Sequence, residues 1–297
     1  SPSDYPVGFF IVRTLQIMKL TCYPKINVGL KVHPLDEYGY HPIQSLFFYA
    51  LGELKDEIYV SSNQSTDIYV RGYEISKEDN LVYKAHLALL SNQVDIGNHL
   101  IKIEKKIPMG AGLGGGSSNA GTYLKTFGKQ SNQLIQIARS LGADIPFFLQ
   151  SKACLVSGHG EILEPLSQKL EIPALLITPH IHSDTGLIFS IFDGLPKSNW
   201  EYQPDMIIKY LKSSDSKLHD ILHNDLERAA CQANPKLALI FSELRLFLTK
   251  RSFYCGMSGS GSTFFALFKT RDLAKKTLSK LLELGYSVFE TTLCTEI

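Results

Sequence analysis

The spacing of hydrophobic and polar residues changes several times along the amino-terminal half of the chain. Near-alternate β-branched and aromatic residues, bounded by turn signals, predict strands within residues 19–32 and 57–70. From Asn80 to Ser91 the apolar residues recur every three or four positions, which predicts a helix with Asp79 or Asn80 as its cap. Apolar and charged residues alternate from 100 to 107, which predicts another strand, and the pattern ends at a proline. The chain therefore starts as a sheet to which helices are added.

The rest of the chain predicts a second α+β unit. Helices are expected over 117–127 and 133–140, the latter closed by Gly142 in the left-handed conformation. A turn-rich stretch at 165–169 marks a domain boundary, because the periodic pattern begins afresh after it. Beyond it we expect strands at 174–177, within 255–268 and at 287–293, and helices at 206–211, 220–231, 236–249 and 271–284. The prediction is an α+β fold with domains at 18–167 and 168–297, preceded by a tag or extension at 1–17.

Composition narrows the class of function. The chain has 297 residues and a formal net charge of +1, with acids and bases mixed, so neither nucleic acid nor an anionic membrane is expected as a partner. No apolar run approaches the roughly 20 residues of a membrane helix. The 5 cysteines are scattered and form no C-x-x-C pair, which fits a reducing cytoplasm better than a disulfide framework or a zinc site.

A glycine-rich loop lies between the strand that ends before residue 108 and the helix that begins near residue 117. Glycines let a backbone approach a ligand closely, and the amides and dipole of a helix start favour an anion. We therefore expect this loop to bind a nucleotide triphosphate through Pro108, Met109, Gly110, Ala111, Gly112, Leu113, Gly114, Gly115, Gly116, Ser117 and Ser118.

Three commoner glycine-rich motifs fit this loop less well. A dinucleotide site needs an acid about 20 residues after its glycines, yet no Asp or Glu occurs from Lys105 to Ala143. A Walker A loop ends in Gly-Lys-Ser/Thr, whereas Gly116 is followed directly by Ser117. A simple hairpin turn remains as an alternative, although turns need one or two glycines rather than five.

The residues 108–120 resemble the second motif of the GHMP kinases, a superfamily of small-molecule kinases. Residues 24–27 and 256–263 resemble the first and third motifs of that superfamily, so the resemblance covers essentially all of residues 18–297. It implies a two-domain kinase with ATP on the loop and the substrate in a cleft between the domains. Asn80 resembles a position beside the adenine, and capping of its own helix is an equally good account of it.

The resemblance also implies a catalytic pair, Lys25 and Asp144. By sequence alone, the Asp144 carboxylate after a helix end could equally be a cap, and Lys25 could be an exposed lysine. In the implied mechanism Asp144 takes the proton of the acceptor hydroxyl, while Lys25 keeps the carboxylate ionised and steadies the γ-phosphate. Mg²⁺ is expected with the ATP, and Ser117 is the candidate ligand for it.

Residues 38–47 resemble the branch of the superfamily whose substrate is a cytidine diphosphate derivative of methylerythritol, in the non-mevalonate route to isoprenoid precursors. This resemblance implies phosphorylation of the 2-hydroxyl of that substrate, in the cytoplasm, by a monomer or weak homodimer. A cytosine can stack on an aromatic ring and be read by an imidazole. The implied substrate-binding residues are Asn27, Tyr40, His41, Thr185 and Phe189. The usual D-G-Y-H of that branch is Tyr38-Gly-Tyr-His here.

Several alternatives stay open at this point. Tyr40 and His41 could be ordinary packing near a strand end. The chain could be a kinase of the same superfamily for another small alcohol, or a non-catalytic nucleotide-binding relative. His219 and His223 have the i, i+4 spacing of a metal pair but lack a third ligand nearby, so a solvated helix face is the preferred interpretation.

Overall fold

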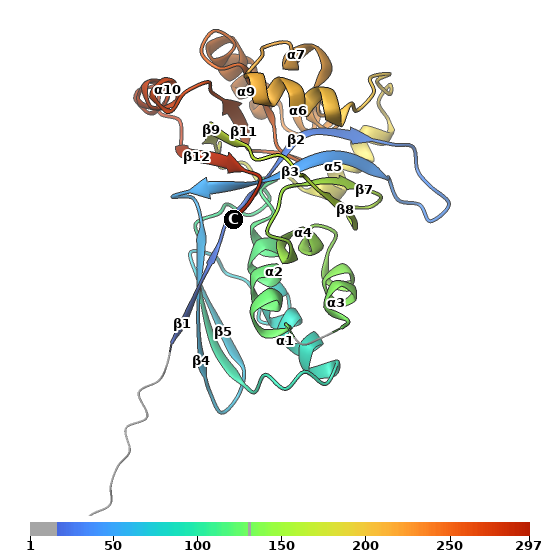
Figure 1. Ribbon diagram of the computed structural model, residues 1–297, viewed down its shortest axis with the longest axis vertical. Helices are drawn as coiled ribbons and strands as arrows, with labels where there is room; N and C mark the ends of the chain where they lie inside the picture. Colours follow the sequence, from blue (N-terminus) through green and yellow to red (C-terminus); the bar gives the residue numbers. More distant parts are fainter. Residues whose placement is uncertain (1–16, 130–131) are drawn as a thin grey trace, which may run out of the picture.

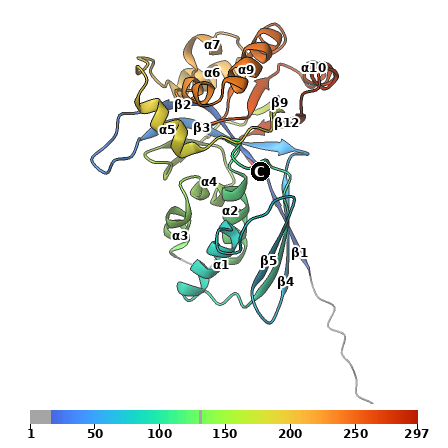
Figure 2. The ribbon, with the colours of Figure 1, turned by 180° about the vertical axis from the view of Figure 1, so that it is seen from behind.

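Two β-sheets, each covered by helices, make up the computed structural model, which describes residues 17–129 and 132–297 (Figures 1 and 2). Nearly all of the predicted tag or extension therefore lies outside the described residues. The smaller sheet has four strands in the order β1 (Met18–Cys22), β4 (Asp56–Ser62), β6 (His99–Glu104) and β5 (Asp67–Arg71). Its β5–β6 pair is parallel and its other pairs are antiparallel.

The larger sheet has eight strands and contains both amino-terminal and carboxyl-terminal segments. Its main path runs β10 (Tyr254–Met257), β11 (Phe264–Leu267), β9 (Glu171–Ile177), β12 (Val288–Cys294), β3 (Ile43–Gly52), β7 (Cys154–Ser157) and β8 (Ile162–Pro165), with β2 (Lys25–Val32) paired to β3. All of these pairs are antiparallel. The boundary predicted between 167 and 168 falls between β8 and β9. The pairing of β12 with β3 joins strands from both sides of this boundary in one sheet. A division into domains at that point stays a prediction.

Helices bury the apolar faces of both sheets. Against the four-stranded sheet lie α1 (Leu81–Ser91), α2 (Gly115–Phe127) and α3 (Leu134–Leu141), around a core that includes Ile58, Ile101 and Tyr123. The short α4 (Ile145–Leu149) packs against α2 and α3. The eight-stranded sheet carries α5 (Thr185–Asp193), α6 (Pro204–Ser213), α7 (Leu218–Ile221), α8 (Glu227–Ala233), α9 (Pro235–Leu248) and α10 (Arg271–Glu283). No helix in the described part of the chain is long and apolar enough to cross a membrane.

Most predicted elements are present within one to three residues of their expected ends, and the α+β class is confirmed. Asn80 caps α1 as predicted, since its Oδ1 accepts from the amide of Val82 at 2.9 Å. The left-handed closure at Gly142 is wrong, because this residue is extended, with φ 166° and ψ 149°.

The helix predicted over 220–231 is wrong in its middle. It is divided into α7 and α8, and between them Asn224 forms a bridge to Leu30 of β2. The bridge is closed by hydrogen bonds from the Leu30 amide to His223 and from the Asp225 amide to Leu30, both 2.9 Å. His219 and His223 therefore do not share a helix face, and the solvated face expected for them is wrong at His219, whose Nε2 is buried.

Candidate active site

The loop between β6 and α2 adopts a backbone that only glycine tolerates well. Gly110, Gly112 and Gly114 have φ values of 61°, 73° and 65°. A Cβ on Gly112 would lie 2.1 Å from the carbonyl oxygen of Ser258, and one on Gly110 would lie 2.1 Å from Nδ1 of His182. Because both the conformation and the space exclude a side chain, the glycines serve the close packing of this loop as well as its approach to a ligand.

The loop leads directly into the amino terminus of α2. The helix starts at Gly115, two residues before the predicted start, and its cap residue Gly114 makes no side-chain hydrogen bond. Gly115, Gly116 and Ser117 line a cavity of about 970 Å³. The free amides of this helix end and its dipole therefore put positive potential on the cavity wall, as an anion site requires.

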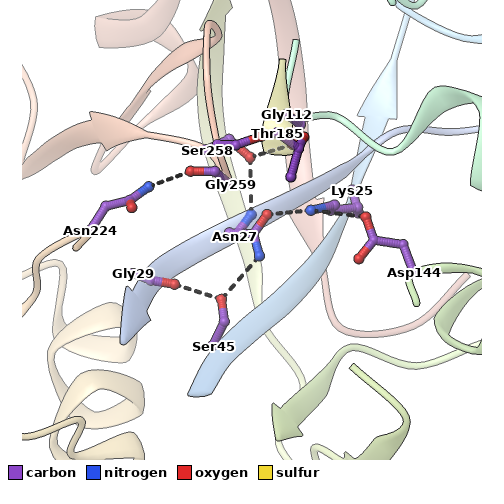
Figure 3. A network of polar contacts seen from close by, with 11 residues as sticks. Lys25, Asn27, Gly29, Ser45, Gly112, Asp144, Thr185, Asn224, Ser258 and Gly259 are labelled. Carbon is purple, nitrogen blue, oxygen red and sulfur yellow. Dashed lines mark hydrogen bonds and ion pairs between the residues drawn. The ribbon is translucent and has the colours of Figure 1, made fainter. Parts of the chain in front are cut away.

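Lys25 and Asp144 face each other in this cavity, as Figure 3 shows. Lys25 begins β2 and Asp144 precedes α4, and Nζ of the lysine lies 3.3 Å from Oδ2 of the aspartate. Lys25 is only 4% exposed, so it is not the surface lysine that sequence left as an alternative. Asp144 makes no capping hydrogen bond to α4, and its side chain stays 31% exposed. A carboxylate and a cation are thus available together at the cavity surface.

Asn27 fixes the position of the lysine. Its Oδ1 accepts a hydrogen bond from Nζ of Lys25, and its Nδ2 donates to Oγ of Ser45 at 3.2 Å (Figure 3). Ser45 in turn donates to the carbonyl of Gly29 at 2.5 Å. Asn27 lines the cavity but is only 2% exposed, and both ends of its amide are engaged within the protein.

The segment 256–263 connects Asn27 to the glycine-rich loop between β6 and α2. Oγ of Ser258 accepts from the amide of Asn27 at 3.2 Å and donates to the carbonyl of Gly112 at 3.0 Å. The amide of Thr263 donates to the carbonyl of Ala111 at 3.1 Å. The three motifs at residues 24–27, 108–120 and 256–263 therefore meet at one place and are joined there by these hydrogen bonds.

Asn224 is a residue that sequence reasoning missed. Its Nδ2 donates to the carbonyls of Met257 at 3.0 Å and Gly259 at 2.8 Å (Figure 3 draws the Gly259 bond). Gly259 and Ser260 line the cavity, so Asn224 holds the cavity-facing turn of the third motif. Only the pairing of β2 with the α7–α8 connection reveals this role.

A buried ion pair was also missed. Nζ of Lys105 lies 2.6 Å from Oδ2 of Asp56, and the side chains are 4% and 0% exposed. Oδ1 of Asp56 accepts from the amides of Lys106 at 2.7 Å and Ile107 at 2.9 Å, and Nδ2 of Asn119 donates to Oδ2 at 2.9 Å. Asp56 therefore anchors the entry to the glycine loop, and its run of donors satisfies a charge that burial would otherwise penalise.

The far end of the cavity is aromatic. The His41 ring stacks on Phe189 with centroids 5.6 Å apart and meets Phe192 edge-on at 5.7 Å. Nδ1 of His41 lies 2.7 Å from the carbonyl of His33, which can only accept, so Nδ1 carries the proton. Nε2 lies 2.9 Å from Oδ1 of Asp193, an ion-pair distance without the angles of a hydrogen bond.

The remaining residues predicted for the site line the cavity, with the exception of Ser118. Tyr40 lines the cavity with 65% of its surface exposed, and Thr185 lines it while its hydroxyl lies 2.9 Å from Oγ of Ser260. Asn80 lines the cavity in addition to capping α1. Ser118 does not line it, because its hydroxyl donates to the carbonyl of Tyr23 at 2.6 Å. Every other residue predicted for the site contributes to the cavity wall.

Comparison with known proteins agrees with this geometry. The family model "GHMP kinases N terminal domain" matches residues 80–152, and "GHMP kinases C terminal" matches residues 208–287. The chain therefore belongs to the GHMP kinases, and it is a phosphotransferase.

Several relatives within that family are similar to this chain over most of its length. The 4-diphosphocytidyl-2-C-methyl-D-erythritol kinase of Thermodesulfovibrio yellowstonii is 35% identical over 273 residues, 87% of this chain and 93% of the relative. The same enzyme of Francisella tularensis subsp. novicida is 35% identical over 277 residues, 88% and 93% of the two chains. A crystal structure of 4-(cytidine 5'-diphospho)-2C-methyl-D-erythritol kinase superposes with a TM-score of 0.76 at 30% identity, covering 93% of this chain and 99% of that one.

A homoserine kinase from Cytophaga hutchinsonii shares the fold alone. Its structure superposes with a TM-score of 0.67 at 18% identity, covering 97% of this chain and 98% of that one. The architecture is therefore common to kinases with different alcohols, and the substrate has to be inferred from the site.

Proposed function

We propose that this chain transfers the γ-phosphoryl group of ATP to the 2-hydroxyl of 4-diphosphocytidyl-2-C-methyl-D-erythritol. The observation that carries the proposal is a single cavity of about 970 Å³ lined by a phosphate loop, a lysine–aspartate pair and an aromatic end with an imidazole. This reaction belongs to the non-mevalonate isoprenoid pathway, and we expect it to occur in the cytoplasm. The relatives that are 35% identical over most of their length carry the name of this activity.

The chemistry follows from the position of the charged pair. Phosphoryl transfer to an alcohol needs a group that takes the hydroxyl proton and cations that offset charge on the transferred phosphoryl. Asp144 has a partly exposed carboxylate for the first task, and Lys25, 3.3 Å away, has a buried ammonium for the second. The hydroxyl oxygen attacks the γ-phosphorus as the bond to the β-phosphate oxygen breaks, Asp144 receives the proton, and ADP leaves.

The phosphates of ATP suit the loop side of the cavity. The backbone amides at the start of α2 and the dipole of its 13 residues favour the polyphosphate there. Asn80 and Asp79 line the same side, which is where the nucleoside would lie. The triphosphate would then place its γ-phosphate next to Lys25.

The aromatic end of the cavity suits a cytosine. Tyr40 and Phe189 have ring faces on which a base can stack, and stacking is worth about 1–3 kcal/mol per base. His41 lines the same end of the cavity, where its ring stacks on Phe189 and its Nε2 lies 2.9 Å from Oδ1 of Asp193, so an imidazole and a carboxylate border the edge of a base stacked there. Thr185, at the start of α5, lies between this end and the third motif.

Magnesium fits this site as a companion of ATP. In the part of the chain that the structure describes, no group of three or more His, Cys, Asp or Glu side chains could enclose a metal ion. Mg²⁺ commonly takes one or two protein oxygens and otherwise phosphates and waters, so the cavity-lining hydroxyl of Ser117 is the protein oxygen that would hold the ion beside the phosphates. Bound there, the ion would offset charge on the β- and γ-phosphates.

A coupled ADP-release assay tests the substrate. The chain is given ATP with diphosphocytidyl methylerythritol, homoserine or mevalonate in parallel reactions. Turnover with the first alone supports the proposal. Turnover with another alcohol would assign the chain to a different branch of the family, and ATP binding without any turnover would make it a non-catalytic relative.

A further inference from the structure

The loop of residues 33–42, which joins β2 to β3, carries the two residues proposed to contact the base. Hydrophobic burial does little to hold this loop, since Leu35 is 54% exposed, Tyr38 72% and Tyr40 65%. Tyr40 and His41 nevertheless have to keep one orientation if they form a wall of the cavity. The forces that fix the loop must therefore be polar.

Asp36 organises the loop from within. Its Oδ1 accepts from the amides of Tyr38 at 3.0 Å and Tyr40 at 3.1 Å, and its own amide donates to the carbonyl of Tyr40 at 2.9 Å. A single carboxylate oxygen thus closes the turn that presents Tyr40.

The second oxygen of Asp36 connects the loop to a different turn. His159 lies in the turn between β7 and β8, and its Nε2 donates to Oδ2 of Asp36 at 2.7 Å. The His159 amide is itself held by Oε2 of Glu161 at 2.7 Å. Partial desolvation raises the pKa of the Asp36 carboxyl, but the hydrogen bonds from Tyr40, His159 and Tyr38 outweigh it, so that pKa lies below its ordinary value.

The two turns are neighbours in the sheet and both reach the cavity. The amide of Ile43 donates to the carbonyl of Gly158 at 2.7 Å, so the base of the loop lies beside the His159 turn. The ring of Tyr40 lies 5.5 Å from that of His159, tilted by 49°. Tyr40, His41 and His159 all line the cavity, whereas Lys25 and Asp144 contact neither member of the Asp36–His159 pair by hydrogen bond or ion pair in the described residues.

We infer that Asp36 and His159 form a positioning pair that holds Tyr40 against the base of the substrate and sets its affinity without taking part in phosphoryl transfer. The inference rests on the proposed function. A charge-assisted hydrogen bond is about twice as strong as a neutral one. Loss of the pair would release the exposed loop and leave the phosphate loop and the charged pair untouched.

Steady-state kinetics of Asp36→Ala, His159→Leu and the double variant test this inference. We expect the KM for diphosphocytidyl methylerythritol to rise about 10-fold in each single variant, the scale of one charge-assisted bond. The kcat and the KM for ATP stay within about 2-fold. The double variant should be no worse than Asp36→Ala alone, because that single change already removes the interaction with His159.

A conservative variant separates positioning from general structure. His159→Gln places an amide donor near the original Nε2, so it should recover most of the substrate KM. Lys19→Ala is the matched control, because it breaks an ion pair of 2.8 Å on the four-stranded sheet, and it should leave both KM values unchanged. Thermal unfolding of every variant shows that each is folded.

The outcomes separate failure of this inference from failure of the proposed function. If the wild type has no turnover with diphosphocytidyl methylerythritol, the proposed function and the inference both fail. If the wild type is active but His159→Leu raises the substrate KM and Asp36→Ala does not, His159 acts alone and the pair is refuted. An equal fall of kcat in both single variants would also overturn the inference.

Discussion

Lys25 at the start of β2 and Asp144 at the start of α4 belong to different layers of the fold, yet their charged groups lie 3.3 Å apart. Asn27 holds the lysine, and Ser258 connects Asn27 to the phosphate loop at Gly112. The Lys25–Asp144 pair and the glycine-rich loop are therefore joined through one network of polar contacts. A substitution in the pair should therefore alter the position of the loop, and a substitution in the loop should alter the position of the pair.

Asp144→Asn should lower kcat by about 10²- to 10⁴-fold, because an amide cannot accept the hydroxyl proton. The KM for both substrates should change little, since the shape of the cavity is kept. Asp79→Asn is the matched control, as it alters another carboxylate that lines the cavity, on the proposed nucleoside side, and should leave kcat within a few-fold. Steady-state rates of ADP release give kcat and KM for the two variants. An Asp144→Asn enzyme with kcat near that of the wild type would remove this residue from the mechanism.

Gly112→Ala should weaken ATP binding by about 10-fold or more and destabilise the fold by about 1–3 kcal/mol. The new Cβ would lie 2.1 Å from the carbonyl of Ser258, so the loop and the third motif must move apart. Gly97→Ala is the control, because Gly97 has a similar φ of 66° but no atom within 4 Å of a Cβ. Nucleotide titration and thermal unfolding of both variants make the comparison. Equal effects of the two changes would mean that backbone strain alone matters.

Asn224→Ala should cost about 1–3 kcal/mol of stability, because two carbonyls lose their donor. It should also raise the KM for both substrates, since the turn at Gly259 and Ser260 lines the cavity. Asn63→Ala removes a comparable bond of 2.8 Å to Ser65 at an exposed turn and serves as the control. Chemical denaturation and initial rates are the measurements. Wild-type kinetics in a destabilised Asn224→Ala enzyme would restrict this residue to a folding role.

A buried histidine pair predicts acid sensitivity of the fold. The hydroxyl of Tyr123 lies 2.8 Å from Nδ1 of His86 and 2.5 Å from Nδ1 of His99, so one histidine accepts from it and the other donates to it. Burial, with the nearby His99 and Lys77, lowers the pKa of His86 to about 4, and burial lowers the pKa of His99. The unfolded chain thus binds more protons than the folded one below the ordinary histidine pKa of 6.5.

The free energy of unfolding should accordingly fall by about 1–3 kcal/mol between pH 6.5 and about 4, with full stability above that window. His86→Gln should show a shallower decline over the same range, because glutamine takes up no proton. The same substitution at the exposed His223 should leave the slope as in the wild type. Urea denaturation at several pH values tests this, and parallel curves for the wild type and His86→Gln would contradict it.

The glycine-rich loop could be predicted from the sequence because the residues that determine its backbone are adjacent in the chain. A strand that stops at a proline, five glycines and a helix start lie next to one another, and the backbone follows from them directly. The strand β3 was missed because residues 46–51 form a continuous apolar run without alternation, as suits a strand that is buried on both faces of the sheet. Periodicity cannot identify such a strand.

The hydrogen-bond and ion-pair partners of residues around the site could not be predicted from the sequence pattern. Asp56 is distant from Lys105 in the chain, and Asn224 is distant from Gly259, so only the sheet pairings bring them together. The helix predicted over 220–231 failed for the same reason, because pairing of Asn224 with Leu30 overrides local helical spacing. Lys25 and Asp144 were singled out through family resemblance, since neither has a distinctive local pattern.

The phosphorus NMR spectrum of the complete reaction tests the central claim most directly. The wild-type chain, ATP, Mg²⁺ and diphosphocytidyl methylerythritol are followed together over time. We predict a new phosphomonoester resonance that grows in step with ADP while the diphosphate resonances of the substrate persist, and its absence with Asp144→Asn. ADP formed with inorganic phosphate and no phosphomonoester, or loss of the substrate diphosphate, would contradict the account.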